Sequence, residues 1–166
     1  MWAWLARRRV PLGFLCAAAA LWLARPTPRT LGAGAAVALA GEALRIWAAG
    51  HLEKGREVTA SGPYRFTRHP LYAGSTLIGL GMAIASASVF VAALATIYLA
   101  LTLFAAIRTE EQHLTHKFGE AYPEYREGRL RGATRTFSLS RAWRNREYRA
   151  VAGLGAALAL LALKTL

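Results

Sequence analysis

Long apolar runs alternate with short polar, basic segments along the whole chain. The longest run, Leu71–Ile107, contains 37 residues without a charged side chain. A single helix of this length would extend about 55 Å, whereas the hydrocarbon core of a bilayer is roughly 30 Å thick. We therefore expect a helical hairpin that turns near Ser86–Ser88. The full pattern predicts five membrane helices, at about residues 10–24, 30–50, 71–86, 88–108 and 148–164, with polar loops at 51–70 and 109–147.

The composition supports this interpretation, because 55% of the residues are hydrophobic although the formal net charge is +12. The basic residues lie between the apolar runs, which is typical of a multi-pass membrane protein and not of a nucleic-acid-binding surface. We predict an all-α, multi-pass integral membrane fold in which residues 1–166 form a single domain. Cys16 is the one cysteine, so it forms no intrachain disulfide and no zinc site is expected.

The distribution of basic residues predicts the orientation. With the N-terminus in the cytoplasm, Arg7–Arg9 and both long polar loops lie inside and contain most of the 21 Lys and Arg, while Arg25, Arg29 and Lys164 lie outside. This topology places the C-terminus outside. The N-terminal basic and apolar stretch also fits a signal peptide, but we interpret it as the first membrane helix. The Ala-, Leu- and Arg-rich composition is typical of a prokaryotic chain, so we expect a prokaryotic cytoplasmic membrane.

A polar stretch, "GPYRFTRHPLYAG" (Gly62–Gly74), precedes the predicted hairpin. Pro63 and Pro70 each remove a backbone donor and move the preceding residue away from helical geometry, which predicts a shaped loop. His69, directly before Pro70, is therefore free to contact a ligand. Because the hairpin returns the chain to the same side of the membrane, we expect residues 62–74 and 108–119 to be neighbours.

Glu110 and Glu111 are the candidate acidic residues of this site, since the surrounding segments are strongly basic. Two carboxylates facing an Arg–His cluster would suit a ligand with amine or hydroxyl groups. Adjacent residues on a helix point about 100° apart, so we expect one of the two to enter the site. Glu110 and His113 also resemble half of a di-iron motif, but its further ligands are missing and no metal is expected.

Two other pairs have open interpretations. Glu42 and Arg45 lie three residues apart, so they share a helix face and form either a structural ion pair or part of a functional site. Gly79 and Gly81 allow close approach, either of another helix or of a flat ligand ring.

The stretch "GPYRFTRHPLYAG", followed by a hairpin and by "RTEE" and "FGEAYPEY", resembles the isoprenylcysteine carboxyl methyltransferase family, which is related to the phospholipid methyltransferases. The likeness covers roughly Leu44–Arg129. It implies an integral membrane enzyme that binds S-adenosylmethionine in a cytoplasmic pocket without a Rossmann domain, and an acceptor that enters from the bilayer. The family usually ends soon after this region, so the resemblance gives no role to the C-terminal basic segment and the last helix.

The resemblance also implies site residues. The cofactor-binding residues that it indicates are His51, Val58, Thr59, Tyr64, His69, Pro70, Leu71, Tyr72, Gly79, Gly81, Glu110 and Glu111. The predicted catalytic residues are Arg108, His69 and Glu111. Arg108 is expected to hold an anionic acceptor, and His69 or Glu111 to serve as the base that an amine acceptor needs.

Two alternatives to a methyltransferase stay open at this stage. The first is an NADPH-dependent membrane reductase of the sterol-reductase type, and the second is a non-catalytic membrane subunit that binds a lipid or cofactor. The methyl acceptor is expected to be a lipophilic small molecule or a lipid that presents a carboxylate, an amine or a thiol. The sequence does not indicate the oligomeric state.

Overall fold

The fold is helical throughout the described part of the chain. The computed structural model describes residues 2–54, 56–119, 121–128 and 135–166, and over these ranges it contains helices and no strand. The elements are α1 (Trp2–Leu23), α2 (Pro28–His51), the 3-10 helix η1 (Gly62–Arg65), α3 (Pro70–Ser86), α4 (Val89–Phe118), α5 (Ala121–Arg126), α6 (Leu139–Arg144) and α7 (Tyr148–Leu163). The predicted all-α class is therefore confirmed.

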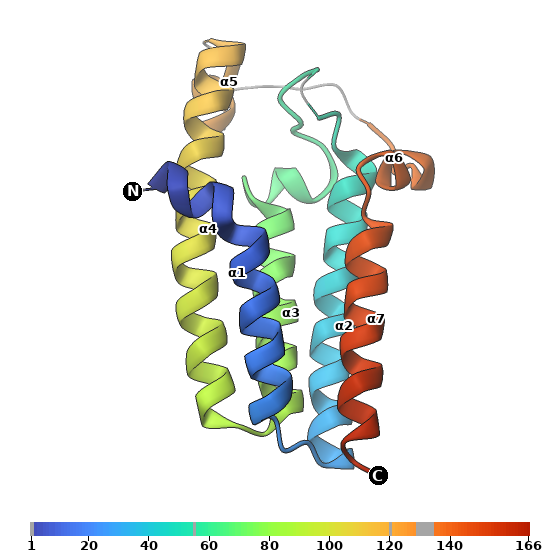
Figure 1. Ribbon diagram of the computed structural model, residues 1–166. Helices are drawn as coiled ribbons and strands as arrows, with labels where there is room; N and C mark the ends of the chain where they lie inside the picture. Colours follow the sequence, from blue (N-terminus) through green and yellow to red (C-terminus); the bar gives the residue numbers. More distant parts are fainter. Residues whose placement is uncertain (1, 55, 120, 129–134) are drawn as a thin grey trace.

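Five long helices, α1, α2, α3, α4 and α7, run side by side as a bundle (Figure 1). The segment after α2, the helices α5 and α6, and the connection before α3 gather at one end, here called the loop end. The turns after α1 and after α3 lie at the opposite end, together with the C-terminus (Figure 1). The polar segments thus occupy the same end of the bundle, as the charge pattern predicts.

Two of these helices, α2 and α4, are long and apolar enough to cross a membrane. Three shorter apolar helices accompany them, at Pro11–Leu23, Pro70–Ser86 and Tyr148–Leu163. The structure thus contains the expected helical bundle with two candidate membrane-crossing helices, and the number of five crossings stays a prediction. The other crossings, the orientation and the assignment of residues 1–166 to one domain stay predictions.

The predicted hairpin turn is confirmed at Ala87 and Ser88. Ala87 adopts a left-handed conformation (φ 49°) that ends α3, and the Ser88 hydroxyl accepts a hydrogen bond from the Val91 amide to start α4. The predicted loop at 109–147 is wrong, because α4 continues to Phe118 and α5 and α6 follow. A change from apolar to polar residues marks where a helix leaves an apolar environment, and it does not end a helix of good helix formers. For the same reason α1 starts at Trp2 instead of near residue 10.

Small residues hold α2 and α3 in close contact. The backbone of Gly81 packs against Gly34 and Ala38 of α2, leaving no room for a Cβ atom. At Gly41, an added Cβ atom would lie 2.7 Å from the Gly74 carbonyl oxygen. Such glycine contacts allow two membrane helices to approach at the backbone. They fix α2 and α3, from whose ends at the loop end the chain enters and leaves the connection 52–69.

Lys164 joins the end of α7 to the end of α1. Its ammonium group donates to the carbonyl oxygens of Leu21 (2.6 Å), Trp22 (3.2 Å) and Ala24 (2.7 Å). The last carbonyl groups of a helix lack partners within the helix and carry partial negative charge, so a cation stabilises them. This contact closes the bundle at the end opposite the site.

Candidate functional site

A cavity of about 180 Å³, here called the central cavity, lies at the loop end of the bundle, and its lining combines charged and apolar side chains. Its walls come from the segment after α2, from the stretch between η1 and the first turn of α3, and from α4. Eight residues predicted from the sequence line it together: Val58, Thr59, Tyr64, His69, Pro70, Leu71, Tyr72 and Glu110. These residues span more than fifty positions of sequence, so the fold collects them in one place.

The two prolines of the opening stretch shape this wall as expected. Gly62 has a left-handed backbone (φ 59°) and starts η1, Pro63 lies in its first turn, and Tyr64 is buried. Pro70 occupies the first turn of α3, where its missing N–H leaves no helical hydrogen bond unmade. His69 before it is non-helical (φ −131°, ψ 56°), so its side chain lines the cavity at the entry to α3.

The stretches 62–74 and 108–119 are neighbours, which confirms the sequence prediction. The Tyr72 hydroxyl donates a hydrogen bond of 2.6 Å to Glu110 Oε2. His69 Nε2 lies 3.1 Å from Glu111 Oε1, and the Arg68 guanidinium lies 3.6 Å from the same oxygen. The start of α3 is therefore joined to α4 by polar contacts at the rim of the central cavity.

The adjacent carboxylates point in different directions, as the helical geometry predicts. Glu110 lines the central cavity, whereas Glu111 lies outside its lining and contacts His69. In this arrangement Glu110 is available to a ligand and Glu111 orients the imidazole ring of His69. The two glutamates therefore have different surroundings, Glu110 at the central cavity and Glu111 at His69.

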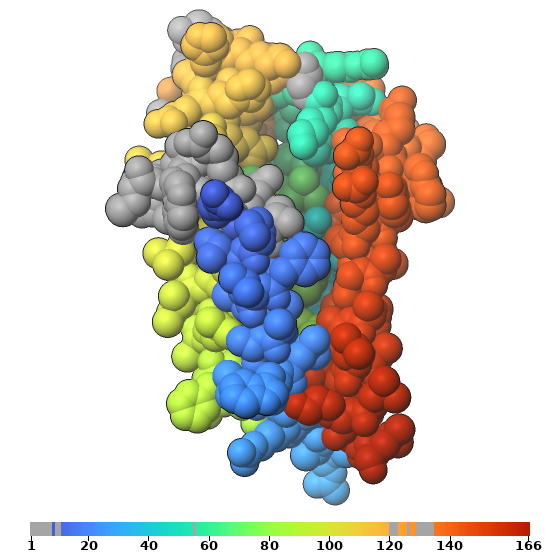
Figure 2. All heavy atoms as spheres, viewed as in Figure 1, coloured from blue at the N-terminus to red at the C-terminus, as the bar shows by residue number. Residues whose placement is uncertain are grey.

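A second cavity of about 480 Å³, here called the bundle cavity, adjoins the central cavity. The residues that both cavities share are Leu52, Lys54, Leu71 and Tyr72. Its α4 wall is largely apolar, with Leu99, Leu103 and Ala106, and its opposite wall is polar. Figure 2 shows the molecule hollowed between α1 and α7, with atoms of α2 and α3 at the bottom of the recess.

Arg45 forms the polar wall of the bundle cavity, and its main partner lies far along the chain. Its Nε donates to Glu147 Oε1 at 2.6 Å, and its Nη1 donates to Ser75 Oγ at 2.5 Å. Glu42 is 3.8 Å from the same Nε, and its buried carboxylate has no hydrogen-bond partner among the described residues. The ion pair expected between Glu42 and Arg45 is thus the weaker contact, and nothing in the sequence spacing indicates Glu147.

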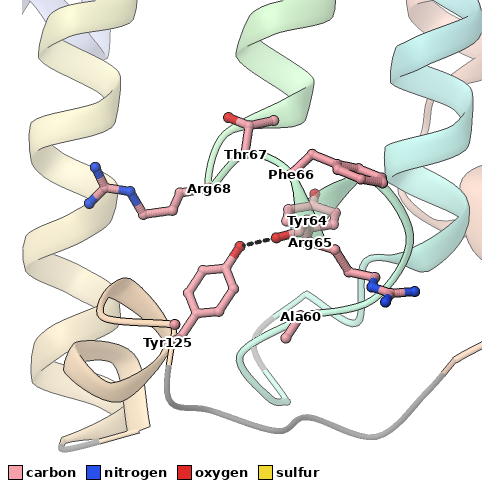
Figure 3. Close-up of a pocket in the computed structure, with 8 residues that line it drawn as sticks. Ala60, Tyr64, Arg65, Phe66, Thr67, Arg68 and Tyr125 are labelled. Atoms are coloured by element: carbon pink, nitrogen blue, oxygen red, sulfur yellow. Dashed lines mark hydrogen bonds between the residues drawn. The ribbon is translucent and has the colours of Figure 1, made fainter.

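A third cavity of about 490 Å³ opens on the other side of η1. Figure 3 shows Tyr125 of α5 meeting Tyr64, while Arg65 and Phe66 point away from Tyr125. The Tyr125 hydroxyl donates to the Tyr64 carbonyl oxygen at 2.7 Å, and both tyrosines line this cavity and the central one. Burial raises the pKa of Tyr125 to about 12 and raises the pKa of Tyr64 further, so both hydroxyl groups stay protonated at neutral pH.

Besides Glu111, four predicted residues do not reach the central cavity. The buried His51 ring packs against Gly62, and its Nδ1 lies 3.0 Å from the Trp47 carbonyl oxygen. Gly79 faces Leu99 of α4, and Gly81 faces α2, so both glycines serve helix packing. The fourth is Arg108.

Arg108 is exposed and lies over the Phe104 ring, 5.0 Å from its centroid, outside the lining of either cavity described above. Residues two apart on a helix point about 200° apart, so Arg108 and Glu110 occupy opposite faces of α4. The geometry does not support the predicted role of Arg108 as the residue that holds the acceptor.

Beyond the eight predicted residues, six others line the central cavity, namely Leu52, Lys54, Glu57, Arg68, Leu114 and Tyr125. Lys54 and Glu57 lie within four residues of the predicted Val58 and Thr59, so their proximity was the available signal. Arg68 is adjacent to His69. Tyr125 belongs to the "FGEAYPEY" stretch, but only the fold of α5 shows that it faces Tyr64.

The described ranges contain no group of three His, Cys, Asp or Glu side chains that could hold a metal ion. Carboxylates, cations and aromatic rings line the cavities, and these groups suit an organic, charged ligand. Together these features describe an apolar helical bundle, with two helices that could cross a membrane and a cavity at its loop end that charged and aromatic side chains line.

The chain belongs to the phospholipid methyltransferase family, whose sequence profile matches residues 9–121. This match confirms the resemblance predicted from the motifs. The matched region contains the predicted cofactor residues and ends before α6 and α7. No solved structure matches the chain.

Two curated relatives carry names that refer to metal resistance. The chain is 36% identical over 105 residues to the cobalt-zinc-cadmium resistance protein CzcN of Cupriavidus metallidurans, which covers 61% of this chain and 45% of the relative. It is 33% identical over 78 residues to the nickel-cobalt-cadmium resistance protein NccN of Alcaligenes xylosoxydans xylosoxydans, which covers 46% and 37% respectively. The chain matches less than half the length of each relative.

Proposed function

We propose that the protein is an S-adenosylmethionine-dependent methyltransferase that acts on a lipophilic acceptor at the cytoplasmic face of a membrane. One observation carries this proposal. In a chain of the phospholipid methyltransferase family, eight of the residues expected to bind the cofactor line a single cavity, which Tyr72 and Glu110 close by a direct hydrogen bond.

The side chains of the central cavity fit the chemistry of S-adenosylmethionine. The cofactor carries an ammonium group and ribose hydroxyls, for which the Glu110 and Glu57 carboxylates are suitable acceptors. Its carboxylate suits the cations of Lys54 and Arg68. Tyr64 offers a buried aromatic surface for a flat ring. When bound, the cofactor supplies a methyl group activated by a sulfonium centre.

The bundle cavity supports a lipophilic acceptor. Its α4 wall is apolar, it adjoins the central cavity through Leu71 and Tyr72, and it lies among helices that are apolar enough for a membrane. An acceptor chain in this cavity would direct its reactive atom toward the central cavity. Transfer then depends mainly on positioning and on exclusion of water, which these packed walls favour.

His69 is the candidate base where the acceptor is an amine, which reacts only after it has lost a proton. The ring lines the central cavity, and the Glu111 carboxylate holds Nε2 at 3.1 Å. Glu111 would thus orient the ring and stabilise the imidazolium that proton uptake creates. A carboxylate or thiolate acceptor does not require this step.

We further propose that the loop end lies in the cytoplasm, with the N-terminus inside and the C-terminus outside. The basic segments at the loop end support this orientation by the positive-inside rule. The cofactor would enter from the aqueous side and the acceptor from the bilayer.

The proposal is tested with purified protein, a membrane lipid extract and S-adenosylmethionine labelled in its methyl group. We expect mass spectrometry to detect the label in a lipophilic product, and Glu110→Gln to reduce labelling at least tenfold. Absence of label in any product, together with absence of calorimetric cofactor binding, would overturn the proposal. Hydride transfer from NADPH in the same extract would instead identify a reductase.

A further inference from the structure

We infer that residues 135–147, here called the C-terminal segment, hold the loop that follows α2 in the shape that the central cavity requires. Arg141 and Asn145 are the main positioning residues of this segment. The segment lies beyond residues 9–121, which the family profile matches. It rests on the proposed function for the identity of the ligand.

The C-terminal segment caps the end of α2. Asn145 Nδ2 donates hydrogen bonds of 2.9 Å to the carbonyl oxygens of Ala49 and Leu52. The carbonyl oxygen of Gly50 accepts from Arg141 Nη1 at 2.5 Å, and it also accepts from the backbone amide of residue 138 at 3.1 Å. The last carbonyl groups of a helix have no partner within the helix, so these donors replace a local cap. They fix the direction in which the chain leaves α2.

Ion pairs extend the same contact along the loop. Arg141 Nε donates to Glu53 Oε1 at 2.8 Å, and Arg135 forms a two-pronged contact with Glu57 at 2.5 and 2.9 Å. Hydrogen bonding and charge from these arginines lower the pKa of both glutamates below its ordinary value. Glu57 itself lines the central cavity, so the segment reaches the wall of the site.

An aromatic contact links the C-terminal segment to η1. The Phe137 ring packs directly on Gly50, where a Cβ atom would collide with it, and lies 6.1 Å from the His51 ring. On its other side the His51 ring packs against Gly62, two residues before Tyr64. His51, which does not line the central cavity, thus transmits the position of the segment to the buried Tyr64 wall.

The loop after α2 has few hydrogen bonds of its own. Between Leu52 and Ser61 the structure shows no regular helix or strand in the described positions, and the internal bonds given for it are Glu53 N to Thr59 Oγ1 (3.3 Å) and Arg56 N to the Glu53 carbonyl oxygen (3.2 Å). Val58 and Thr59 nevertheless line the central cavity. A loop with so few internal bonds opens easily unless outside groups hold it, and the C-terminal segment supplies those groups.

The C-terminal segment also reaches the bundle cavity. Asn145 and Glu147 line that cavity, and Glu147 fixes the Arg45 guanidinium at 2.6 Å. One continuous piece of chain therefore positions groups on both cavities. In this arrangement Arg135 and Arg141 of the segment contact Glu57 and Glu53 of the loop.

The test uses Arg141→Ala and Asn145→Ala in the full-length protein, with Arg149→Ala as the matched control. Arg149 is an exposed arginine of α7 whose guanidinium lies 6.0 Å from the Tyr148 ring. Two quantities are measured: the calorimetric Kd for S-adenosylhomocysteine and the hydrogen-exchange rate of the amides between residues 51 and 61. For Arg141→Ala we expect about a tenfold higher Kd and faster exchange in this loop, and no change for the control.

Arg141→Lys keeps the charge opposite Glu53, so it should give an intermediate Kd, which a loss of general stability would not predict. If Arg141→Ala does not yield a monodisperse protein, Asn145→Ala carries the same test with a smaller change. Unchanged exchange and unchanged Kd in a folded variant would overturn the inference. Wild-type protein that fails to bind the ligand would overturn the proposed function, and the exchange rates alone would then decide the role of the segment.

Discussion

The Tyr72 hydroxyl on α3 donates a 2.6 Å hydrogen bond to Glu110 on α4, and this bond joins positions 38 residues apart. Both residues line the central cavity, so the bond holds two of its walls together. It also orients the Glu110 carboxylate, leaving the second oxygen available to a ligand. The polar stretch 62–74 therefore contacts the last part of the hairpin directly.

Replacing Tyr72 by phenylalanine should weaken cofactor binding without unfolding the protein. The variant keeps the ring and removes only the donor to Glu110, which is an exposed hydrogen bond worth about 1 kcal/mol, or about fivefold in affinity. Calorimetry with S-adenosylhomocysteine measures the change. Tyr148→Phe, on α7 outside both cavities, is the control, and an equal loss in the two variants would contradict the role given to Tyr72.

Arg108 and Lys54 should differ in their importance for the cofactor. Lys54 lines both cavities, whereas Arg108 packs on Phe104 outside them. We expect Lys54→Ala to raise the Kd about fivefold, as for the loss of one exposed ionic contact, and Arg108→Ala to leave it unchanged. The Kd values of the two variants, measured side by side, check this. A loss of cofactor affinity confined to Arg108→Ala would contradict the placement of Lys54, and not Arg108, at the cofactor.

Acid should weaken the contact between the C-terminal segment and the loop after α2. The pKa values of Glu53 and Glu57 lie below their ordinary value of 4.5 in the folded protein, so folding favours their charged forms. Their contribution to stability is therefore fully present above about pH 4.5 and is lost as the pH falls through the lowered pKa values. The difference in Tm between wild type and Arg141→Ala should shrink on acidification from pH 7 to pH 3.

Thermal unfolding in detergent measures this difference at each pH, and Arg149→Ala provides the reference for removal of a surface charge. Because Arg141 also donates to the Gly50 carbonyl oxygen, the difference should decrease and not vanish. A difference that grows toward acid would show that the two glutamates do not hold the segment.

Gly81→Ala should destabilise the bundle. The added methyl group would collide with the backbone of Ala38 and Gly34 on α2, and such overpacking typically costs about 1–3 kcal/mol. Gly153→Ala on α7 has no atom within 4 Å of the new Cβ, so it should be neutral or slightly stabilising. Thermal unfolding compares the two variants. If Gly81→Ala instead lowered cofactor affinity with no change in Tm, Gly81 would face the cofactor as the resemblance implies.

Much of the bundle could be predicted from the sequence, because apolar runs and their breaks are local signals. The hairpin turn at Ala87–Ser88 follows from a run too long for one helix. The helices α5 and α6 could not be found in this way, since they are short and polar and owe their place to contacts with distant segments. The first polar residues of α4 mark where its apolar part ends, but the helix itself continues to Phe118.

The candidate site could likewise be predicted in part from the sequence. The meeting of residues 62–74 with 108–119 follows from topology alone, and the resemblance selects most residues of the central cavity. The pairing of Arg45 with Glu147 spans 102 positions and depends on how α7 packs, which no spacing rule provides. The direction in which Arg108 points depends on how α4 is rotated about its own axis. Apolar residues surround this helix on all sides, so the sequence does not show which face points to the site.

The glycine contacts between α2 and α3 have a consequence for ligand exchange. Helices that touch at the backbone cannot separate without losing many close contacts at once, so α2 and α3 form an immobile pair. The opposite walls come from the far end of α4 and from α5, which Tyr125 joins to η1 by a hydrogen bond to the Tyr64 carbonyl oxygen. Admission and release of solutes should therefore proceed by bending of α4 and α5 away from a stationary wall.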